Sequence, residues 1–334
     1  MKRHLTTIAL VLTLGLLLFS APSEAGLSWT GPTAIVGVKK VNASGMQFLK
    51  IGTSARAAGM GDAFTAVGND INAIFFNGAG LTHIKKLGYS VNYVKWLNNT
   101  NLYSIAAAWN TGSSRGEVIG FSAVVFKPED MVERTILQPD GTGQMIRYGD
   151  TAIGILYAVK FTDKFSFSAK LNYVQEKMFT TNTSTVVFDL GSFFYTGFKS
   201  LRVAMSFRNF GPDKAADSYR YFMPLYYNMA VAGEVYGEKG KPFYITIDAE
   251  SAFAVDYEQR YLFGAEAWIH DQLALRVGYK QNFDLEAFSV GVGVKQTFSG
   301  DKGVTLDVAY SPLKKQGGVK MFDPVLRVSL GGAF

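Results

Sequence analysis

The chain has 334 residues, a formal net charge of +6, no cysteine, 14% aromatic residues and only 18% charged residues. That charged fraction is below the roughly 25% of ordinary soluble proteins, and the modest, scattered positive charge argues against a nucleic-acid-binding surface. A chain without cysteine has no disulfides, so it must be held together by its own packing and hydrogen bonds, which a large soluble domain or a closed barrel can provide.

The first 25 residues are organised as a secretory signal peptide. Lys2 and Arg3 precede an apolar run over residues 6–19, and a stretch of small and polar residues then ends at Ala25. The apolar run is shorter than the roughly 20 residues that a spanning helix needs, so a membrane anchor is the less favoured alternative. We therefore predict residues 1–25 as a cleaved signal peptide. In the mature chain, residues 26–334, no segment is apolar for long enough to form a transmembrane helix.

Residues 26–87 are predicted to form an N-terminal extension and hatch ahead of the first strand. From residue 48 onward this region is rich in alanine and glycine and lacks the alternation of a strand, and Ser54 and Asp70 are candidate helix N-caps. Small residues allow helices and turns to pack closely inside the lumen of a wide barrel. Three aromatic side chains of this region either pack within the hatch or line a possible ligand pocket: Phe64, Phe75 and Phe76.

From Gly88 to Phe334 the sequence alternates between apolar and polar residues with a period of two, as strands with one apolar face do. We count fourteen such segments, centred near residues 92, 106, 121, 155, 170, 190, 204, 230, 247, 265, 276, 291, 307 and 329. One face of nearly every segment is aliphatic or aromatic, which favours a lipid-facing wall over a soluble sandwich. The predicted fold class is all-β, a transmembrane antiparallel β-barrel of about fourteen strands over residues 88–334, with the hatch inside its lumen.

The connections between the predicted strands alternate in length. Three are tight, at residues 161–164, 196–200 and 270–271, and three are longer and polar, at residues 128–149, 177–182 and 211–221. Short turns at one end and long loops at the other are typical of outer-membrane barrels, and this arrangement predicts that the long loops face the outside of the cell.

Charged residues occupy many positions on the polar faces of these segments, which would face the lumen of a barrel. Asp248, Glu250 and Glu266 lie on neighbouring predicted strands and invite comparison with paired catalytic carboxylates. An unpaired charge in a narrow lumen is costly, so we interpret these carboxylates as structural groups that hold the hatch in place. Their expected basic partners are Arg56, Arg202 and Arg276.

No catalytic residue, cofactor or metal site is predicted. Gly59 and Gly61 begin the pattern of a nucleotide-binding loop, but Phe64 stands where its third glycine belongs. After signal removal only His83 and His270 remain, far apart and without any cysteine. This argues against a transition-metal site and leaves little basis for a serine–histidine catalyst. We therefore predict that the protein is not an enzyme.

The final predicted strand ends on an aromatic residue. Phe334 shares one face with Leu326, Val328 and Leu330. A terminal aromatic on an amphipathic last strand resembles the signal that barrel-insertion machinery reads, so we expect that machinery and outer-membrane lipids as partners.

The hatch region also carries a family resemblance. The run 54–67, followed by residues 69–70 and 77–81, resembles the N-terminal signature of the PorV/PorQ family, within the wider FadL-like group of outer-membrane barrels. Further matches lie at residues 248–250, 264–266, 275–280 and 289–294, so the resemblance covers nearly the whole mature chain. Gly78 departs from the pattern, because proline is usual there. The hatch motif consists of Arg56, Gly59, Gly61, Asp62, Asn77 and Gly80.

The resemblance implies a fourteen-strand barrel with its N-terminal segment folded inside as a hatch, and it implies one of two roles. PorV-like proteins bind secreted cargo proteins in type IX secretion and hand them to surface-attachment subunits, and here the loop 128–149 would be the contact surface. FadL-like proteins carry long-chain fatty acids and other hydrophobic molecules across the outer membrane. The N-terminal match is closer to PorV/PorQ, so the first role is the favoured hypothesis, transport is the alternative, and a structural role is the third.

Overall fold

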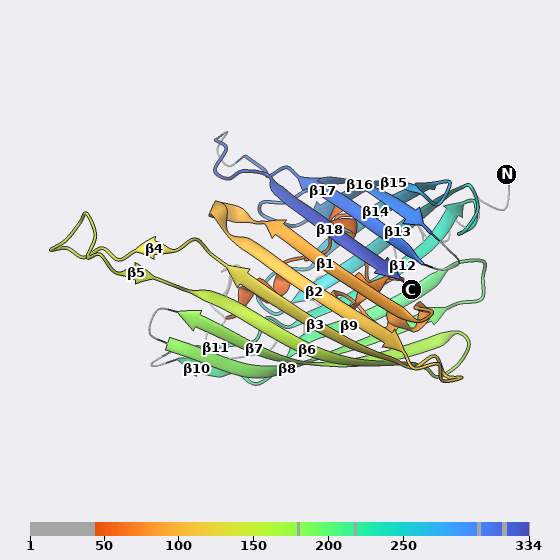
Figure 1. Cartoon of the computed structure of the whole chain (residues 1–334), viewed down its shortest axis with the longest axis horizontal. Coiled ribbons are helices and arrows are strands. Elements are labelled where there is room, and N and C mark those ends of the chain that lie inside the picture. The colour runs from red at the N-terminus through yellow and green to blue at the C-terminus, as the bar shows by residue number, and fades with distance from the viewer. Residues whose placement is uncertain (1–43, 179–180, 217–218, 299–301, 316–318, 334) are drawn as a thin grey trace.

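The computed structural model describes residues 44–333 except 179–180, 217–218, 299–301 and 316–318. The predicted signal peptide, the extension before residue 44 and the terminal Phe334 lie outside the described residues. Fourteen strands close into one antiparallel barrel, and β1 (Leu87–Lys95) completes the circle by pairing with β18 (Val325–Ala333) (Figure 1). Each of the fourteen predicted centres falls within one of these strands, which confirms the predicted fold class and strand number.

The other twelve wall strands pair in the order in which they follow one another in the chain. They are β2 (Asn101–Asn110), β3 (Val118–Lys127), β6 (Gly149–Lys160), β7 (Phe165–Met178), β8 (Thr181–Tyr195), β9 (Arg202–Phe210), β12 (Tyr226–Tyr236), β13 (Phe243–Ala254), β14 (Arg260–Ile269), β15 (Leu273–Gln281), β16 (Phe288–Thr297) and β17 (Gly303–Ser311).

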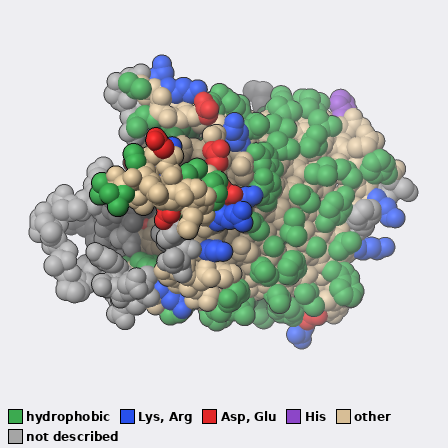
Figure 2. All heavy atoms as spheres, turned by 60° about the vertical axis from the view of Figure 1, so that its left-hand side comes forward, with side chains coloured by type: hydrophobic (Ala, Val, Ile, Leu, Met, Phe, Trp, Pro, Cys, Tyr) green, Lys and Arg blue, Asp and Glu red, His purple; other side chains and the backbone are tan. Residues whose placement is uncertain are grey.

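Side chains of the wall alternate between its outer surface and its lumen. On β2, Tyr103, Ile105 and Trp109 are exposed, whereas Ser104 and Ala106 are buried. Exposed aliphatic and aromatic side chains gather into the wide belt that Figure 2 shows over the barrel. Closure pairs the backbone of every wall strand on both sides, so that such a surface can lie in lipid without a free edge.

The two ends of the barrel differ, and we call them the turn end and the long-loop end. The turn end holds the connections 111–117, 161–164, 196–201, 237–242, 270–272 and 298–302. The long-loop end holds the other connections, two of which contain short hairpins, β4 (Met131–Val132) with β5 (Met145–Ile146) and β10 (Lys214–Ala216) with β11 (Tyr219–Tyr221). The β4–β5 hairpin projects far beyond the wall (Figure 1).

One predicted long connection is wrong. Residues 177–182 were expected to form a polar loop, but Lys177 pairs with Asn182 and Met178 pairs with Thr181, so β7 and β8 extend almost to each other. The polar residues here continue both strands past the apolar belt into solvent, and their composition alone does not distinguish an extended hairpin from a loop.

The hatch lies inside the lumen, as predicted. It contains the helical segments η1 (Gln47–Lys50), α2 (Ala55–Gly59), η2 (Ile71–Phe75) and η3 (Gly78–His83), while η4 (Leu97–Asn99) joins β1 to β2 outside it. Both predicted N-caps are confirmed, because Ser54 accepts from the amide of Ala57 at 3.4 Å and Asp70 accepts from that of Asn72 at 2.8 Å. The segment begins at the long-loop end, where the amide of Gly45 donates to the carbonyl of Phe222, and it runs to β1 at the turn end.

No helix among the described residues is long and apolar enough to cross a membrane.

Candidate functional site

The hatch backbone touches the wall where three neighbouring strands carry inward-facing glycines. A Cβ atom placed on Gly278 would lie 1.9 Å from the amide nitrogen of Gly61, and one placed on Gly291 would lie 2.9 Å from the Cα atom of Gly59. A Cβ on Gly264 would meet the hatch backbone at 2.6 Å. Gly61 also has a φ of +67°, which favours glycine. The glycines of the hatch motif and those of β14, β15 and β16 therefore form one close backbone contact.

Beside this contact, the predicted charges form a buried chain of ion pairs. Arg56 donates to both oxygens of Glu266, at 2.8 and 2.6 Å, and to Asp70 at 2.7 Å. Arg276 donates to the same Glu266 at 2.6 Å and to Asp307 at 2.7 Å. Each arginine therefore has two carboxylate partners. Because Glu266 belongs to the wall, it compensates the charge of Arg56 only while the hatch is docked.

A second charged cluster joins the hatch to the long-loop end. Lys280 donates to Asp62 of the hatch and, at 2.8 Å, to Glu286 in the connection after β15. Arg327 donates to Glu286 at 3.2 Å and to the carbonyl of Gly52 at 3.1 Å. Burial alone would raise the pKa of the Glu286 carboxyl, but the two neighbouring cations outweigh it and hold that pKa at about 2.

Two of the three predicted carboxylates do not pair with an arginine as expected. Glu250 accepts the backbone amides of Phe64 and Thr65, at 3.2 and 3.1 Å, and the side-chain amide of Asn228. It therefore holds the hatch through amide donors rather than through a cation. Asp248 is fully buried, and the ion pairs of the described residues do not include it.

Arg202 has a partner that the sequence did not single out. It donates to both oxygens of Glu234 at 3.0 Å and to the hatch carbonyl of Ala66 at 2.7 Å. Glu234 lies on β12 and points inward. Its sequence neighbours are mainly alanine, glycine and valine, so the sequence alone did not distinguish it from a solvent-exposed residue.

The second half of the hatch motif fixes the hatch to itself and to β8. Asn77 donates to the carbonyls of Thr65 and Ser192, at 3.1 and 2.9 Å, and caps η3. A Cβ atom on Gly80 would lie 1.9 Å from the carbonyl oxygen of the hatch residue Gly68. Gly78, which departs from the family pattern, faces Leu156 so closely that a Cβ atom would lie 2.1 Å from its side chain. Leu156 therefore fills the space beside this position.

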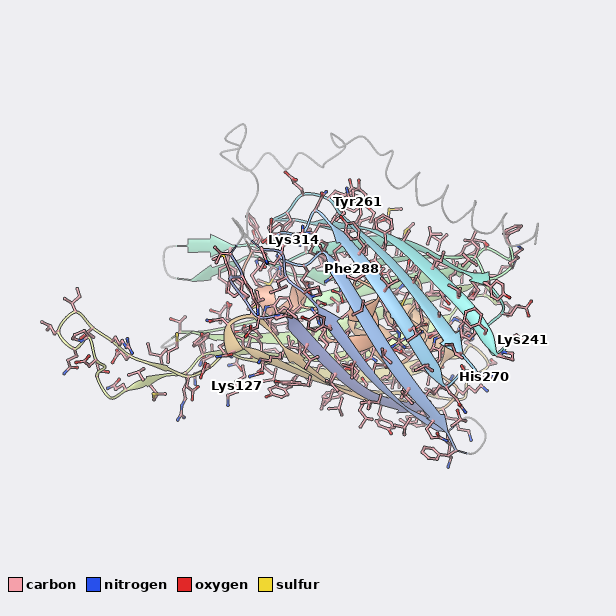
Figure 3. The ribbon with its side chains drawn as sticks, turned by 90° about the horizontal axis from the view of Figure 1, so that it is seen from above. Lys127, Lys241, Tyr261, His270, Phe288 and Lys314 are labelled. Atoms are coloured by element: carbon pink, nitrogen blue, oxygen red, sulfur yellow. The ribbon has the colours of Figure 1, made fainter. Side chains whose placement is uncertain are left out.

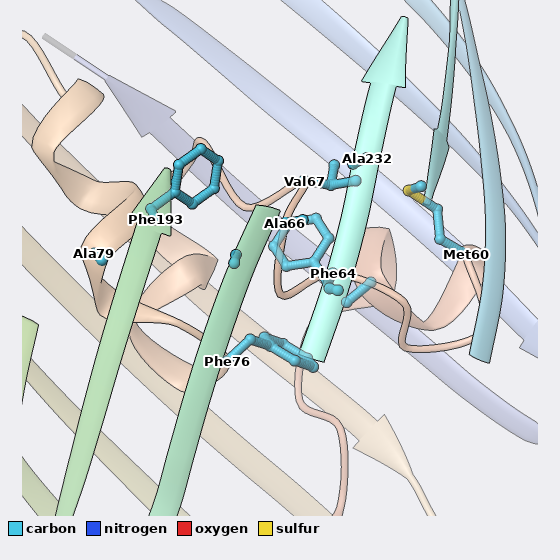
Figure 4. Packing of buried hydrophobic residues seen from close by; sticks show 11 residues of the cluster. Met60, Phe64, Ala66, Val67, Phe76, Ala79, Phe193 and Ala232 are labelled. Carbon is cyan, nitrogen blue, oxygen red and sulfur yellow. The ribbon is translucent and has the colours of Figure 1, made fainter. Parts of the chain in front are cut away.

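The three predicted pocket phenylalanines have different environments. Phe64 is fully buried and meets Phe76 edge to face, with 5.3 Å between ring centroids, in a cluster with Phe193 (Figure 4). It packs the hatch and lines neither of the cavities described next. Phe75 and Phe76 both line a small cavity of about 50 Å³ against the wall, and Phe76 also reaches the larger one.

An open cavity of about 820 Å³ lies above the hatch at the long-loop end. Arg260 lines it, stacked 3.8 Å from the ring centroid of Tyr257 and 4.3 Å from that of Phe283. Arg208 lines it as well, over the rings of Phe76 and Tyr226. Of the three phenylalanines predicted to line a pocket, only Phe76 lines this cavity, because its walls come from the hatch and from strands on all sides of the barrel. Its aromatic lining residues are Phe48, Phe76, Trp96, Phe126, Tyr221, Tyr226, Tyr257 and Phe283.

The described residues contain no group of three or more histidine, aspartate and glutamate side chains placed to hold a metal ion. His83 is half-buried in the hatch between the rings of Phe193 and Tyr195. Burial, followed by the field of nearby cations, lowers its pKa to about 4, so it stays neutral near pH 7.

Comparison with protein-family models finds no match, and neither does comparison with curated protein sequences. Among solved structures, the barrel is similar to the toluene transporter TbuX of Ralstonia pickettii, with a TM-score of 0.55 and 11% identity over 84% of this chain and 96% of that chain. It is similar to a mutant of the monoaromatic hydrocarbon channel TodX, with a TM-score of 0.57 and 11% identity over 84% of this chain and 98% of that chain. A Pseudomonas aeruginosa FadL homologue gives a TM-score of 0.50 and 12% identity over 84% and 98%.

A closed fourteen-strand wall around a docked hatch defines the class of the protein, a hatch-containing β-barrel. More particularly, it has the fold of the FadL-like outer-membrane barrels. At 11–12% identity the similarity establishes the fold alone, and the finer resemblance to PorV/PorQ proteins stays a prediction.

Proposed function

We propose that the protein is an outer-membrane channel that takes up small hydrophobic molecules from the cavity at its long-loop end. The observation that carries this proposal is an open cavity of about 820 Å³ that the hatch closes on its inner side. Its lining combines aromatic rings with charged side chains such as Arg208, Arg260 and Glu286. The similar folds of a toluene transporter and a monoaromatic hydrocarbon channel support it. Transport is therefore favoured over the secretion role, which was the favoured hypothesis from the sequence.

The cavity and the hatch differ in what they favour. Moving apolar surface from water onto aromatic walls is favourable by about 25 cal/mol per Å². Below the cavity, buried ion pairs such as Arg56–Glu266 hold the hatch in the lumen. A docked hatch of this kind opposes the free passage of water and ions, while the cavity concentrates apolar solutes above it.

The test is uptake by cells that express the protein compared with cells that carry an empty vector. Radiolabelled toluene and oleate represent a small neutral hydrocarbon and a long-chain fatty acid. We expect faster uptake of at least one of them, and a several-fold loss when two lining rings are removed together by Tyr257→Ala and Phe283→Ala. The matched control removes two outward-facing rings of similar size, Tyr279→Ala and Phe288→Ala. Uptake equal to that of the empty vector for both solutes would reject the proposal.

A second candidate function, binding of secreted cargo and surface-attachment subunits, is favoured by the projecting β4–β5 hairpin. At its tip Ile136 is 100% exposed and Leu137 is 92% exposed. Adjacent apolar side chains so far from the wall are a usual feature of a protein contact. We propose that Ile136→Ser with Leu137→Ser would abolish co-purification of exported proteins in mild detergent while leaving solute uptake intact. Unchanged co-purification, or the absence of any partner from the wild-type preparation, would exclude this function.

A further inference from the structure

Basic side chains occur around nearly the whole circumference of the turn end. In the six turn-end connections and the hatch exit, residues 84–86, the described residues include eight basic and four acidic side chains. Every one of these seven segments except 270–272 carries at least one lysine or arginine. Acidic side chains outnumber basic ones in the described connections of the long-loop end. Lys239 lies among the lumen charges near Arg202 and Glu234 and is set apart. We call the other seven residues the turn-end ring: Lys85, Lys86, Arg115, Lys164, Lys199, Lys241 and Lys302.

The turn-end ring lies just beyond an aromatic girdle. At the strand ends and turns beside it, Phe298 is 70% exposed, Phe161 is 65% exposed and Trp109 is 59% exposed, and four further rings share this position: Tyr157, Phe198, Tyr236 and Phe243. Exposed aromatic rings in such girdles lie at the boundary between hydrocarbon and headgroups. In Figure 2 the apolar belt ends at this side and is followed by lysine and arginine side chains. The turn-end ring therefore lies at the depth of lipid headgroups.

We propose that the turn-end ring binds the anionic headgroups of phospholipids in the leaflet that surrounds the turn end. Its charges lie on connections between different strand pairs around the barrel, instead of forming a patch on one side. Figure 3 shows Lys241 at this end, remote from Lys127 and Lys314 at the other. A ring of this kind fits the lipids that encircle the protein better than it fits a single acidic protein partner. The inference does not depend on which solute the channel carries.

The expected strength follows from the electrostatics of membrane surfaces. A lysine or arginine next to an anionic surface contributes about 1 kcal/mol, which corresponds to a roughly fivefold change in affinity for each contact, and the effect decreases within a Debye length of about 10 Å at 0.1 M salt. The aromatic girdle fixes the depth of the cations, so that this attraction acts at short range. Lys199, for example, has its Nζ atom 5.6 Å from the ring centroid of Phe198.

The test compares two quadruple variants of the full-length mature protein in mixed detergent–lipid micelles. The turn variant carries Lys86→Gln, Arg115→Gln, Lys164→Gln and Lys241→Gln, which removes one exposed cation from each of four segments. The loop variant carries Lys95→Gln, Lys127→Gln, Lys314→Gln and Lys315→Gln, which removes the same charge from the other end. Native mass spectrometry counts the phosphatidylglycerol and phosphatidylcholine molecules that each folded barrel retains. The mobility of unheated and heated protein in gels confirms that each variant is folded.

We expect wild type and the loop variant to retain phosphatidylglycerol in preference to phosphatidylcholine, and the turn variant to retain several-fold less of it. Raising the salt from 0.1 M to 0.5 M should reduce the preference of wild type in the same direction. Equal retention by the turn variant and wild type, or an equal loss in the loop variant, would overturn the proposal. Loss of a co-purifying acidic protein from the turn variant, with lipid retention unchanged, would assign the surface to a protein and also overturn it.

Discussion

Glu266 links the hatch to the wall through two arginines that come from distant parts of the chain. Both of its oxygens accept from Arg56, and one also accepts from Arg276. All three side chains are almost completely buried, so that each charge depends on the others for compensation. A group in this position contributes more by preventing unpaired buried cations than by its own attraction to them.

We therefore expect Glu266→Gln to lower the free energy of unfolding by about 3–5 kcal/mol, because it leaves two buried arginines short of a carboxylate. Urea titration of the barrel in phospholipid vesicles, followed by tryptophan fluorescence, measures this change. The control is Glu258→Gln, which neutralises an exposed carboxylate in the connection after β13 and should change stability by less than about 0.5 kcal/mol. A midpoint for Glu266→Gln equal to that of wild type would contradict the assigned role.

Glu286 predicts how stability depends on pH. Its folded pKa of about 2 lies below the ordinary value of 4.5, so its contribution is fully present above pH 4.5 and is lost as the pH decreases toward 2. Unfolding midpoints measured between pH 6 and pH 3 should therefore decrease, and Glu286→Gln should decrease less over the same interval. Identical slopes for the two proteins would show that Lys280 and Arg327 do not depend on this carboxylate.

At the scale of elements, β14, β15 and β16 provide a flat inner surface because glycines face the lumen where α2 and the residues after it dock. Sequence alternation predicted these strands and their inward faces, but it gave no indication of what lies against Gly278 or Gly291. Some inward glycines are required because the hatch backbone leaves no room for a side chain, and others are not. Only the distance from each glycine to the hatch backbone distinguishes the two kinds. The same limit explains the wrong loop at residues 177–182, since only strand pairing distinguishes a polar hairpin from a polar loop.

Gly278→Ala should loosen the hatch without opening the barrel, because its methyl group would lie 1.9 Å from the backbone of Gly61 and neither backbone can move independently. Overpacking of this kind costs about 1–3 kcal/mol. Hydrogen–deuterium exchange of residues 55–62 should accelerate at least several-fold. Gly120→Ala is the matched control, because the nearest atom there is the end of the flexible Ile74 side chain at 3.0 Å. Equal exchange in both variants would contradict the importance of the close backbone contact.

At the scale of the whole molecule, the hatch fills the lumen of a wide barrel and leaves a cavity at the long-loop end. Fourteen strands enclose a lumen larger than inward side chains alone can fill, and the hatch occupies it. Its attachments are distributed over both halves of the wall: Arg56 reaches β14, Asn77 reaches β8, and Ala55 donates its amide to Ser329 of β18 at 2.8 Å. Loss of one attachment leaves the others in place.

We accordingly expect the native barrel to pass no appreciable ionic current in a planar lipid bilayer, and a deletion of residues 54–80 to conduct ions. The deletion removes α2, η2 and the first half of η3, and it exposes the inward charges of the wall to a water-filled lumen. Single-channel recording measures the conductance, and heat-dependent gel mobility verifies that the deleted protein still folds as a barrel. A folded deletion protein that remains non-conducting would show that something other than the hatch closes the lumen.

The sequence by itself determined the all-β class, the fourteen strands, the tight turns and the presence of a hatch, because a period of two is a local property of each strand and small-residue enrichment is a local property of the hatch. It also identified Arg56, Glu266 and Arg276 as related charges. Only the tertiary structure decided that Glu250 binds backbone amides, that Arg202 pairs with Glu234, and that the aromatic cavity exists. These features depend on which residues the closed wall brings opposite the hatch. Such contacts join residues that are far apart in the chain, and a single sequence has no periodic pattern that indicates them.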